Sequence, residues 1–359
     1  MNRREFVAAA CSAGTQRALH QSDLRGLAVE KLEAFCLSVR RGTWLLFRLY
    51  ARNGATGIGD ASHGGDDRAV IEFARRLVAA FQSRSIFEIE YLRQRALPLV
   101  QNYGRPAAVA LGGIEQCLWD LQGQFLGVPV YQLFGGALRK RIPVYANINR
   151  ATQLRTPEGF ARLAAEAVRA GFRAVKLAPF DGMPKPGSDR AEFERWTELG
   201  IACARAVREA IGPTRELLID VHKHMDFESG LRLAQRLEPL RLYWLEEITP
   251  SVEDQARIKR QVRIPVAGGE SLFGVGDFYR YIRAEAAHIL MPDIKSCGGM
   301  LELKKIAAMA EGAGLLISPH GPASPVGNIA AAHVCATLPN FQILEYAFGE
   351  VPWRAELVE

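Results

Sequence analysis

Charged and imidazole side chains recur at a nearly constant interval along the second half of the chain. Successive members lie 23 to 27 residues apart, and each one closes a short apolar run. The six residues are Asp220, Glu246, Glu270, Asp293, His320 and Glu345. A parallel (β/α) barrel of roughly 250 residues contains eight strand-and-helix units, so one unit is about this long. The interval therefore predicts a parallel barrel whose strands end in these residues.

The ends of the predicted strands should meet at one mouth. Buried parallel strands read as continuous apolar runs, and barrel enzymes keep their chemistry at the C-terminal ends of the strands. A charged residue at the end of each successive strand would place these side chains together. We therefore expect them to form a single active site.

Two regions with different patterns of elements make up most of the chain. In the first, strand-like stretches at 29–37 and 44–50 precede helical patterns at 67–82, 86–94 and 107–126. Strands followed by helices predict an α+β domain, which we place at residues 25–138. From residue 139 to 359 strands and helices alternate, and that alternation predicts the barrel domain.

Residues 1–24 look like a leader that is not part of the fold. Arg3-Arg4-Glu5-Phe6 and a short apolar stretch resemble a twin-arginine export signal without a clean cleavage site, and a disordered leader is the alternative. The six cysteines show no Cys-x-x-Cys spacing and mostly lie in apolar stretches, which indicates core residues in a reducing compartment. We expect a cytoplasmic protein, with export as the alternative.

Composition excludes two classes of partner. The formal net charge is +6, but the basic residues are scattered and form no dense run with interleaved aromatic residues, so we expect no nucleic acid partner. No apolar run is long enough to span a membrane. The 359 residues, 48% of them hydrophobic, can bury the cores of two domains. A small-molecule substrate fits these observations best.

Asp220, Glu246 and Glu270 are predicted to end three successive strands. Oxygen ligands favour Mg²⁺ over zinc, because zinc sites usually include His or Cys. Magnesium also keeps coordination positions open for water and a chelating substrate. Each carboxylate alone could simply pair with a neighbouring Lys or Arg. Three of them on consecutive strands favour one Mg²⁺ site.

The histidines supply candidates for proton transfer. Asp293 and His320 end neighbouring strands, and a carboxylate that holds one imidazole nitrogen suits the other nitrogen to act as a general base. A satisfied buried histidine is the alternative, and His333 on an apolar helix illustrates it. His222 lies two residues after Asp220, on the same face under strand alternation, so it should project towards whatever the metal holds.

Two glycine-rich polar loops are candidates for substrate contact. The loop 57–66 contains His63 and Asp66, and the loop 179–189 contains Asp181. The second loop lengthens one repeat by nearly twenty residues, which is unusual for a connection without a functional task. We expect both loops to contribute to substrate specificity.

Several motifs carry a resemblance to a known family. They include Gly113-Ile-Glu-Gln-Cys-Leu-Trp-Asp, Trp244-Leu-Glu-Glu247, Gly269-Glu270, Met291-Pro-Asp293 and Pro319-His320-Gly321. Through them residues 25–350 resemble the enolase superfamily, and specifically its mandelate racemase subgroup. The resemblance implies a capping domain over a modified TIM barrel of the (β/α)₇β type, in which Asp220, Glu246 and Glu270 bind Mg²⁺.

The resemblance also implies a reaction class. It implies removal of the proton α to a carboxylate, with Mg²⁺ balancing the charge of the enediolate. Glu345 matches the family's acid that hydrogen-bonds the substrate carboxylate. Even-numbered assemblies are common in the family, so we expect a homo-oligomer. Its members usually continue past the last strand with a segment that returns to the capping domain. This chain stops soon after Trp353-Arg354, so we expect that segment to be missing or the cap to close differently.

Two departures from the racemase pattern favour elimination. Racemases of the subgroup carry Lys-x-Lys at the end of the second barrel strand, whereas this chain has Lys176-Leu177-Ala178. Lys176 can hydrogen-bond the carboxylate, but alanine cannot move a proton. Asp293 stands where muconate cycloisomerases and dipeptide epimerases place a lysine, which argues against both activities.

The second departure is Asp220-Val221-His222, which resembles the Asp-x-His of acid-sugar dehydratases such as galactonate dehydratase. There the histidine is a general acid that protonates the leaving 3-hydroxyl. The resemblance therefore implies a Mg²⁺-dependent hydro-lyase that converts a 2R-configured aldonate to a 2-keto-3-deoxy acid. A one-base epimerase or racemase-like enzyme acting on another carboxylate, and a non-catalytic metal-binding descendant, are the alternatives.

Overall fold

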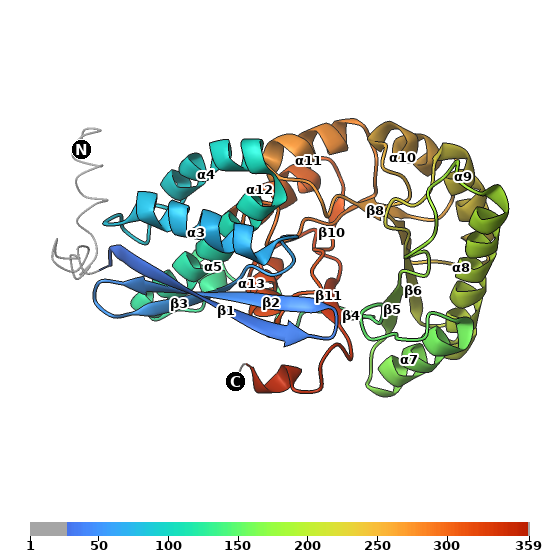
Figure 1. Ribbon diagram of the computed structural model, residues 1–359, viewed down its shortest axis with the longest axis horizontal. Coiled ribbons are helices and arrows are strands. Elements are labelled where there is room, and N and C mark those ends of the chain that lie inside the picture. The colour runs from blue at the N-terminus through green and yellow to red at the C-terminus, as the bar shows by residue number, and fades with distance from the viewer. Residues whose placement is uncertain (1–26, 358–359) are drawn as a thin grey trace, which may run out of the picture.

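The structure is a computed structural model, and it describes residues 27–357. Figure 1 shows an N-terminal capping region beside a larger C-terminal barrel. The predicted leader, residues 1–24, lies outside the described residues. Among residues 27–357, no helix combines the length and the apolar character needed to cross a bilayer.

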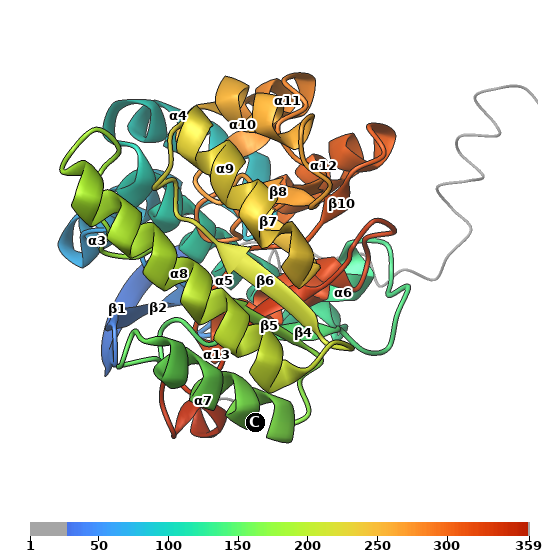
Figure 2. The same cartoon turned by 90° about the vertical axis from the view of Figure 1, so that its right-hand side faces the viewer.

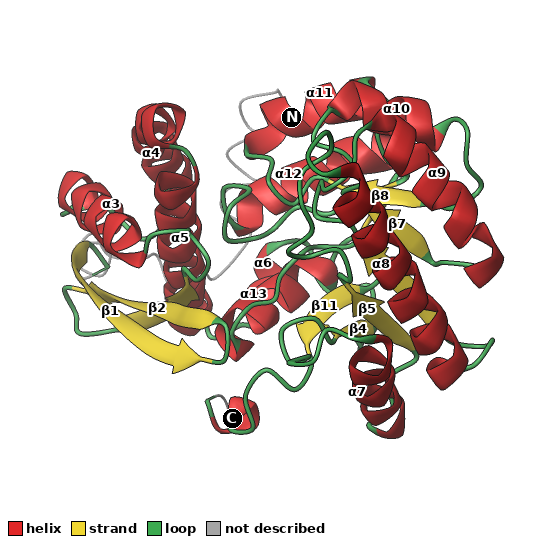
Figure 3. Cartoon of the chain, turned by 45° about the vertical axis from the view of Figure 1, so that its right-hand side comes forward, coloured by secondary structure: helices red, strands yellow, loops and turns green. Residues whose placement is uncertain are grey.

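The capping region has one antiparallel sheet and three helices. Its strands pair in the order β1-β2-β3. They are β1 (Val29–Val39), β2 (Gly42–Ala51) and β3 (Thr56–Asp60). The helices are α3 (Asp67–Phe81), α4 (Ile89–Tyr103) and α5 (Arg105–Leu126). Figure 3 shows the helices on one face of the sheet, where apolar side chains of both layers form a continuous core. The predicted α+β fold is confirmed.

Two local predictions in this region are wrong. The segment predicted as a loop from residue 57 begins with β3, which the sequence obscures because Gly57 and Gly59 supply no apolar side chain. Both glycines are needed for packing, since a Cβ on them would lie 2.1 Å from Cys117 O and 2.2 Å from Gly113 O of α5. The second helix continues past its predicted end and through Pro98 to Tyr103.

The barrel contains eight parallel strands, in the order β10-β9-β8-β7-β6-β5-β4-β11. The strands are β4 (Val144–Asn147), β5 (Ala174–Leu177), β6 (Glu216–Asp220), β7 (Trp244–Glu246), β8 (Val266–Gly268), β9 (Ile289–Leu290), β10 (Leu316–Ile317) and β11 (Leu344–Ala347). The circle closes where Ile317 N–H donates to Asn340 O and Gln342 N–H donates to Ile317 O.

Seven α-helices connect these strands, which confirms the (β/α)₇β pattern among the described residues. They are α7 (Pro157–Arg169), α8 (Arg190–Ile211), α9 (Phe227–Leu237), α10 (Val252–Lys259), α11 (Gly274–Arg283), α12 (Met300–Gly312) and α13 (Pro325–Cys335). Figure 2 shows α8 and α9 covering the outside of the sheet near β5 and β6. The short helix α6 (Val130–Leu133) precedes β4, and the predicted domain boundary at residue 138 stays a prediction.

The strands are shorter than the apolar runs suggested. Asp220 and Glu246 are the last residues of β6 and β7 and pair in register, as predicted. Glu270, Asp293 and His320, however, lie two or three residues beyond their strands, in the loops of the mouth. Glu345 lies inside β11 rather than at its end. The fixed interval thus reflects the repeating unit, whereas the height of each side chain varies.

Buried polar contacts tie the cap to the barrel next to the mouth. Asp60 Oδ2 accepts hydrogen bonds from Ser324 N at 2.8 Å and Ser324 Oγ at 2.6 Å. Glu115 on α5 accepts from Met300 N at 2.7 Å and Leu301 N at 2.9 Å, at the N-terminus of α12. These carboxylates satisfy donors that a helix start leaves free, so they fix the cap against specific barrel helices.

The C-terminal residues that the structure describes contact the cap, and the expectation that the usual segment is missing or that the cap closes differently stays a prediction. Trp353 packs edge-on against Trp44 of β2 with ring centroids 5.4 Å apart, and Val351 joins the same apolar cluster. Arg354, which is 6% exposed, donates to Ala323 O at 2.8 Å. These contacts form where the hairpin of β1 and β2 reaches over this side of the barrel.

The cysteine prediction is partly confirmed. Four of the described cysteines are buried and none of the described cysteines is in a disulfide, but Cys36 is exposed on β1. Cys11 lies outside the described residues. The exposed position arises because β1 is the edge strand of the sheet and one of its faces meets no helix.

Candidate active site

Three carboxylates converge at the mouth of the barrel. Asp220, Glu246 and Glu270 each offer an oxygen, and these oxygens lie within 4.8 Å of one another. Asp220 and Glu246 are 2% and 0% exposed, whereas Glu270 stands at the open side. The sequence prediction that these three side chains lie together is therefore met by the geometry.

Lys176 of β5 occupies the floor of this cluster. Its Nζ lies 3.0 Å from Glu246 Oε1, 2.9 Å from Glu345 Oε1 and 3.7 Å from Asp220 Oδ2. Burial alone would lower the pKa of Lys176, but the neighbouring carboxylates raise it well above its ordinary value, so the ammonium is charged. One buried cation thus serves several carboxylates.

The cluster fits a divalent cation by its donor set and by its charge. Burial and then the charge of Asp220 raise the pKa of Glu246 well above its ordinary value, so a cation on the cluster would favour its ionised form. Among the described residues, Glu270 Oε2 is buried and makes no hydrogen bond, although His320 Nε2 lies 3.2 Å away. Three oxygen donors match the ligands that Mg²⁺ takes in proteins.

His320 stands beside Glu270 and is held by Asp293. Its Nδ1 lies 2.8 Å from Asp293 Oδ2, and its Nε2 faces Glu270 Oε2 at 3.2 Å. Asp293 also accepts from Lys295 Nζ at 3.0 Å. Burial alone would lower the pKa of His320, but Glu270, Glu345 and Asp293 raise it to about 9. Positive charge placed on Glu270 would reduce that rise, so more of His320 would be in the neutral, proton-accepting form once the cluster holds a cation.

Sequence reasoning missed Lys295, which is completely buried. The Asp293 and Lys295 charges lie together because α5 approaches their loop closely. A Cβ on Gly112 would lie 2.3 Å from Lys295 O. The sequence offered no signal for this contact, since it depends on the packing of the cap.

Glu345 is ionised in this arrangement. It accepts from Asn147 Nδ2 at 2.6 Å and from Gly321 N at 2.8 Å, and it pairs with Lys176. Burial opposes ionisation, but Lys176 and His320 lower the pKa of Glu345 to about 2. An ionised carboxylate only accepts hydrogen bonds. To donate one to a substrate carboxylate, Glu345 must first take a proton.

His222 follows β6 and contacts the carboxylate cluster at Asp220, whereas His320 follows β10 and contacts it at Glu270. Its Nε2 lies 2.9 Å from Asp220 Oδ2, and its Nδ1 hydrogen-bonds Asp181 Oδ1. Burial alone would lower the pKa of His222, but the Asp220 charge and the hydrogen bonds to Asp181 and Asp220 raise it to about 12. The imidazole is therefore protonated in the substrate-free protein. His222 has a left-handed φ of 47°, and its N–H donates to Asp220 Oδ1.

The two residues predicted in the loop 57–66 have other partners in this structure. His63 Nε2 contacts Pro322 O at 2.9 Å, so the loop rests on the segment that follows His320. Asp66 is the N-cap of α3 and accepts from Arg68 N and Ala69 N. Substrate contact by either residue stays a prediction.

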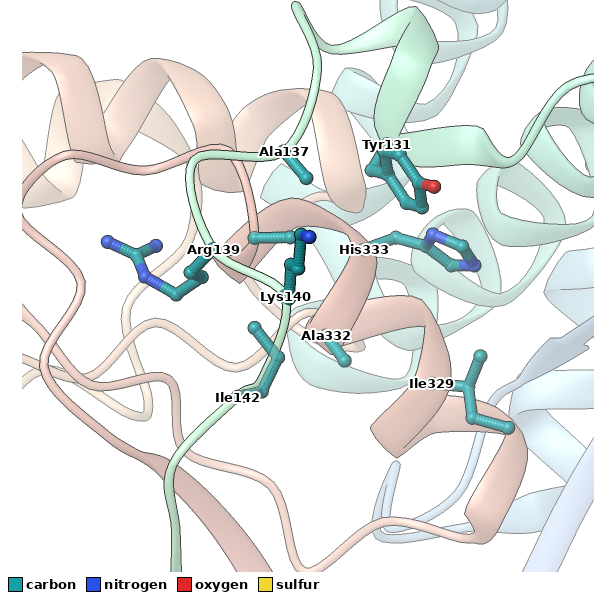
Figure 4. A pocket seen from close by; sticks show the side chains of 9 residues that line it. Tyr131, Ala137, Arg139, Lys140, Ile142, Ile329, Ala332 and His333 are labelled. Atoms are coloured by element: carbon teal, nitrogen blue, oxygen red, sulfur yellow. The ribbon is translucent and has the colours of Figure 1, made fainter.

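A separate cavity of about 400 Å³ lies outside the barrel mouth (Figure 4). Its lining comes from α6, the segment before β4 and α13, and His333 stacks on Tyr131 with ring centroids 5.6 Å apart. Arg139 and Lys140 are its charged lining residues, and none of the residues that line it carries a carboxylate. It lacks the acids and the base that converge at the mouth.

Comparison with known families assigns both parts of the chain. The profile described as "Mandelate racemase / muconate lactonizing enzyme, N-terminal domain" matches residues 31–135. The profile described as "Enolase C-terminal domain-like" matches residues 159–359.

Individual relatives match over most of their length. D-xylonate dehydratase of Haloferax volcanii is 30% identical over 88% of this chain and 78% of that protein. D-gluconate/D-galactonate dehydratase of Picrophilus torridus is 32% identical over 88% of this chain and 80% of that protein. The crystal structure of a mandelate racemase/muconate lactonizing enzyme-like protein from Rubrobacter xylanophilus superposes with a TM-score of 0.85 at 31% identity, covering 93% of this chain and 89% of that one.

Proposed function

The chain belongs to the mandelate racemase and muconate lactonizing enzyme family of the enolase superfamily, and we propose that it is a Mg²⁺-dependent dehydratase of a sugar acid. Relatives of about 30% identity carry the names of D-xylonate, D-galactonate and D-gluconate dehydratases. The proposed substrate is an aldonate with R configuration at C2, and the proposed product is a 2-keto-3-deoxy acid.

The observation that carries the proposal is the placement of two histidines on one carboxylate cluster. His320 Nε2 faces Glu270 and His222 Nε2 faces Asp220, so two proton-transfer groups from different strands meet at the same site. Racemisation needs a base on each face of C2. Elimination needs a base at C2 and an acid at C3, and this chain has Ala178 where the subgroup's racemases have the second lysine.

Asp220, Glu246 and Glu270 would hold the cation. When bound there, Mg²⁺ supplies positive charge that offsets the negative charge developing on the substrate carboxylate. Lys176 lies within reach of the same region and can hydrogen-bond that carboxylate. Its charge is present in the substrate-free protein because three acids already surround it.

His320 would take the proton from C2. Asp293 holds Nδ1, which leaves Nε2 as the basic atom and keeps the ring directed at the cluster. His222 would then give a proton to the 3-hydroxyl as its bond to C3 breaks. Water leaves, a double bond forms between C2 and C3, and the resulting enol tautomerises to the keto acid.

The test is a dehydration screen of the purified protein with Mg²⁺. We expect a 2-keto-3-deoxy product from at least one aldonate in a panel that spans both C2 configurations and includes aldarates. The signal should vanish with excess chelator and return with added Mg²⁺. Exchange of the C2 proton for deuterium without any dehydration would point instead to a one-base epimerase. Metal binding without exchange would point to a non-catalytic descendant.

A further inference from the structure

The loop between β5 and α8 places one carboxylate, that of Asp181, at the mouth of the barrel. Asp181, four residues after β5, has a side chain that is 18% exposed, and its Oδ1 hydrogen-bonds His222 Nδ1. The sequence predicts Asp181 as a substrate contact. Substrate contact stays a prediction, and in the structure Asp181 contacts other residues of the chain.

The second oxygen of Asp181 is anchored by residues from two other segments, the loop between β4 and α7 and the cap. Oδ2 lies 3.0 Å from Asn149 Nδ2 and 3.3 Å from an Arg155 nitrogen, and Arg41 of the cap approaches to 3.9 Å. Arg155 also donates to Asn149 Oδ1 at 2.9 Å and to Ala178 O, so it ties the loop to the end of β5. Burial opposes ionisation, but His222, Asn149 and Arg155 together lower the pKa of Asp181. The carboxylate is an ionised acceptor in a fixed place.

The ring that Asp181 holds is arranged like the ring of His320. In both histidines Nδ1 meets an aspartate, Asp181 or Asp293, while Nε2 faces an acid of the cation cluster. A carboxylate on one nitrogen fixes the orientation of the ring and the position of its second proton. The backbone alone does not fix it, since the His222 side chain is 34% exposed.

We propose that Asp181 is a positioning residue that holds His222 Nδ1–H so that Nε2 delivers the proton to the leaving hydroxyl. This inference rests on the proposed dehydration. In that step the Nε2 proton passes to the 3-hydroxyl oxygen, the C3–O bond breaks with its electron pair on oxygen, and water departs. The C2–C3 double bond takes the electrons of the broken C2–H bond. His222 is left neutral, with its remaining proton on Nδ1 towards Asp181.

The test compares two reactions of one enzyme in D₂O, exchange at C2 and dehydration, in an Asp181→Asn variant. Exchange depends on His320 and should stay within about twofold of wild type, whereas dehydration should fall by about 10- to 100-fold, the usual loss when a supporting hydrogen-bond partner is removed. The ratio of exchange to dehydration should therefore rise. Asp189→Asn is the matched control. It removes the same charge from the same loop, it keeps the N-cap of α8, and its contacts do not include His222.

A second readout does not depend on activity. The Nδ1 proton of His222 should give a downfield hydrogen-bonded resonance in the Mg²⁺-loaded enzyme that disappears in His222→Asn and in Asp181→Ala. Loss of exchange and dehydration in equal measure in Asp181→Asn, or unchanged dehydration, overturns the positioning role. Persistence of the resonance in Asp181→Ala does so too. A wild-type enzyme that shows the resonance but dehydrates no acid overturns the proposed function and leaves the Asp181 contact in place.

Discussion

Two histidines with matching surroundings are assigned opposite tasks, and the difference lies in what each faces. His320 Nε2 lies beside Glu270, and His222 Nε2 lies beside Asp220, at the deeper end of the cluster. His222 has the higher pKa, about 12 against about 9; burial lowers both, but the charge of Asp220 and the hydrogen bonds to Asp181 and Asp220 raise that of His222 further. The more strongly protonated ring suits the acid, and the other suits the base.

This assignment predicts a split between two variants. His320→Asn should abolish both deuterium exchange at C2 and dehydration, because the proton is never removed. His222→Asn should keep exchange and lose dehydration by about 100-fold or more, the scale of a general acid's contribution. Proton NMR in D₂O measures both reactions in one sample. Identical behaviour of the two variants would contradict the roles.

At the level of single residues, the sequence predicted what repeats and missed what depends on packing. Asp220 and Glu246 could be placed because each ends a strand in a regular series. Lys295 and Asn147 could not be placed. Lys295 contacts Asp293 from a loop and Asn147 contacts Glu345 from the end of β4, and no sequence pattern marks either position. Asp181 was noticed only for its loop, because the contact with His222 joins segments 41 residues apart.

Elements of the two regions meet through helix termini as well as through apolar contacts, since Phe273 and Leu301 of the barrel pack against the capping core. Glu115 of α5 sits over the start of α12, where it accepts from two backbone N–H groups and from Trp119 Nε1 at 2.7 Å. The motif that contains Glu115 thus joins the cap to the barrel in this chain. Glu115 is only 1% exposed, so water could not replace its carboxylate as the acceptor if the side chain were changed.

Replacing Glu115 with glutamine should destabilise the protein. The amide group has one acceptor oxygen, so at least one buried N–H at the start of α12 loses its partner, at a cost of about 1–3 kcal/mol. Chemical denaturation measures the change in the free energy of unfolding. Glu311→Gln, on an exposed turn at the end of α12, is the control and should have little effect. Equal stability of Glu115→Gln and wild type would contradict this role.

The element boundaries that were wrong share a physical cause. Thr56–Asp60 forms a strand because it pairs with β2 and packs closely on α5, although its two glycines give it no apolar pattern. The helix α4 continues through Pro98 because Leu92, Ala96 and Val100 keep one apolar face packed on the capping core. In both cases tertiary packing overrides the local signal.

Across the whole molecule, acids concentrate at the mouth of the barrel, where Lys176 is shared among three of them. Glu270 Oε2 makes no hydrogen bond among the described residues, although His320 Nε2 lies 3.2 Å away. A ligand that binds only the folded state stabilises it by mass action. Divalent cations should therefore act on stability as well as on activity.

Mg²⁺ should raise the melting temperature of the wild-type protein. At a concentration about 100 times the dissociation constant, the gain in unfolding free energy should be about 2.7 kcal/mol. Glu270→Gln should lose most of this gain, and the comparison is made against its own metal-free melting temperature because Glu270 also faces His320 Nε2 at 3.2 Å. Differential scanning calorimetry against KCl of matched ionic strength measures the effect. A Glu270→Gln protein that gains as much as wild type would contradict the site.

The most direct measurement is a crystal structure of the His320→Asn variant with Mg²⁺ and an aldonate identified in the dehydration screen. We expect the cation on Asp220, Glu246 and Glu270, with the C2 hydrogen of the bound acid facing residue 320 and its 3-hydroxyl facing His222. A cation bound elsewhere, or a bound acid whose C2 hydrogen points away from residue 320, would contradict the account.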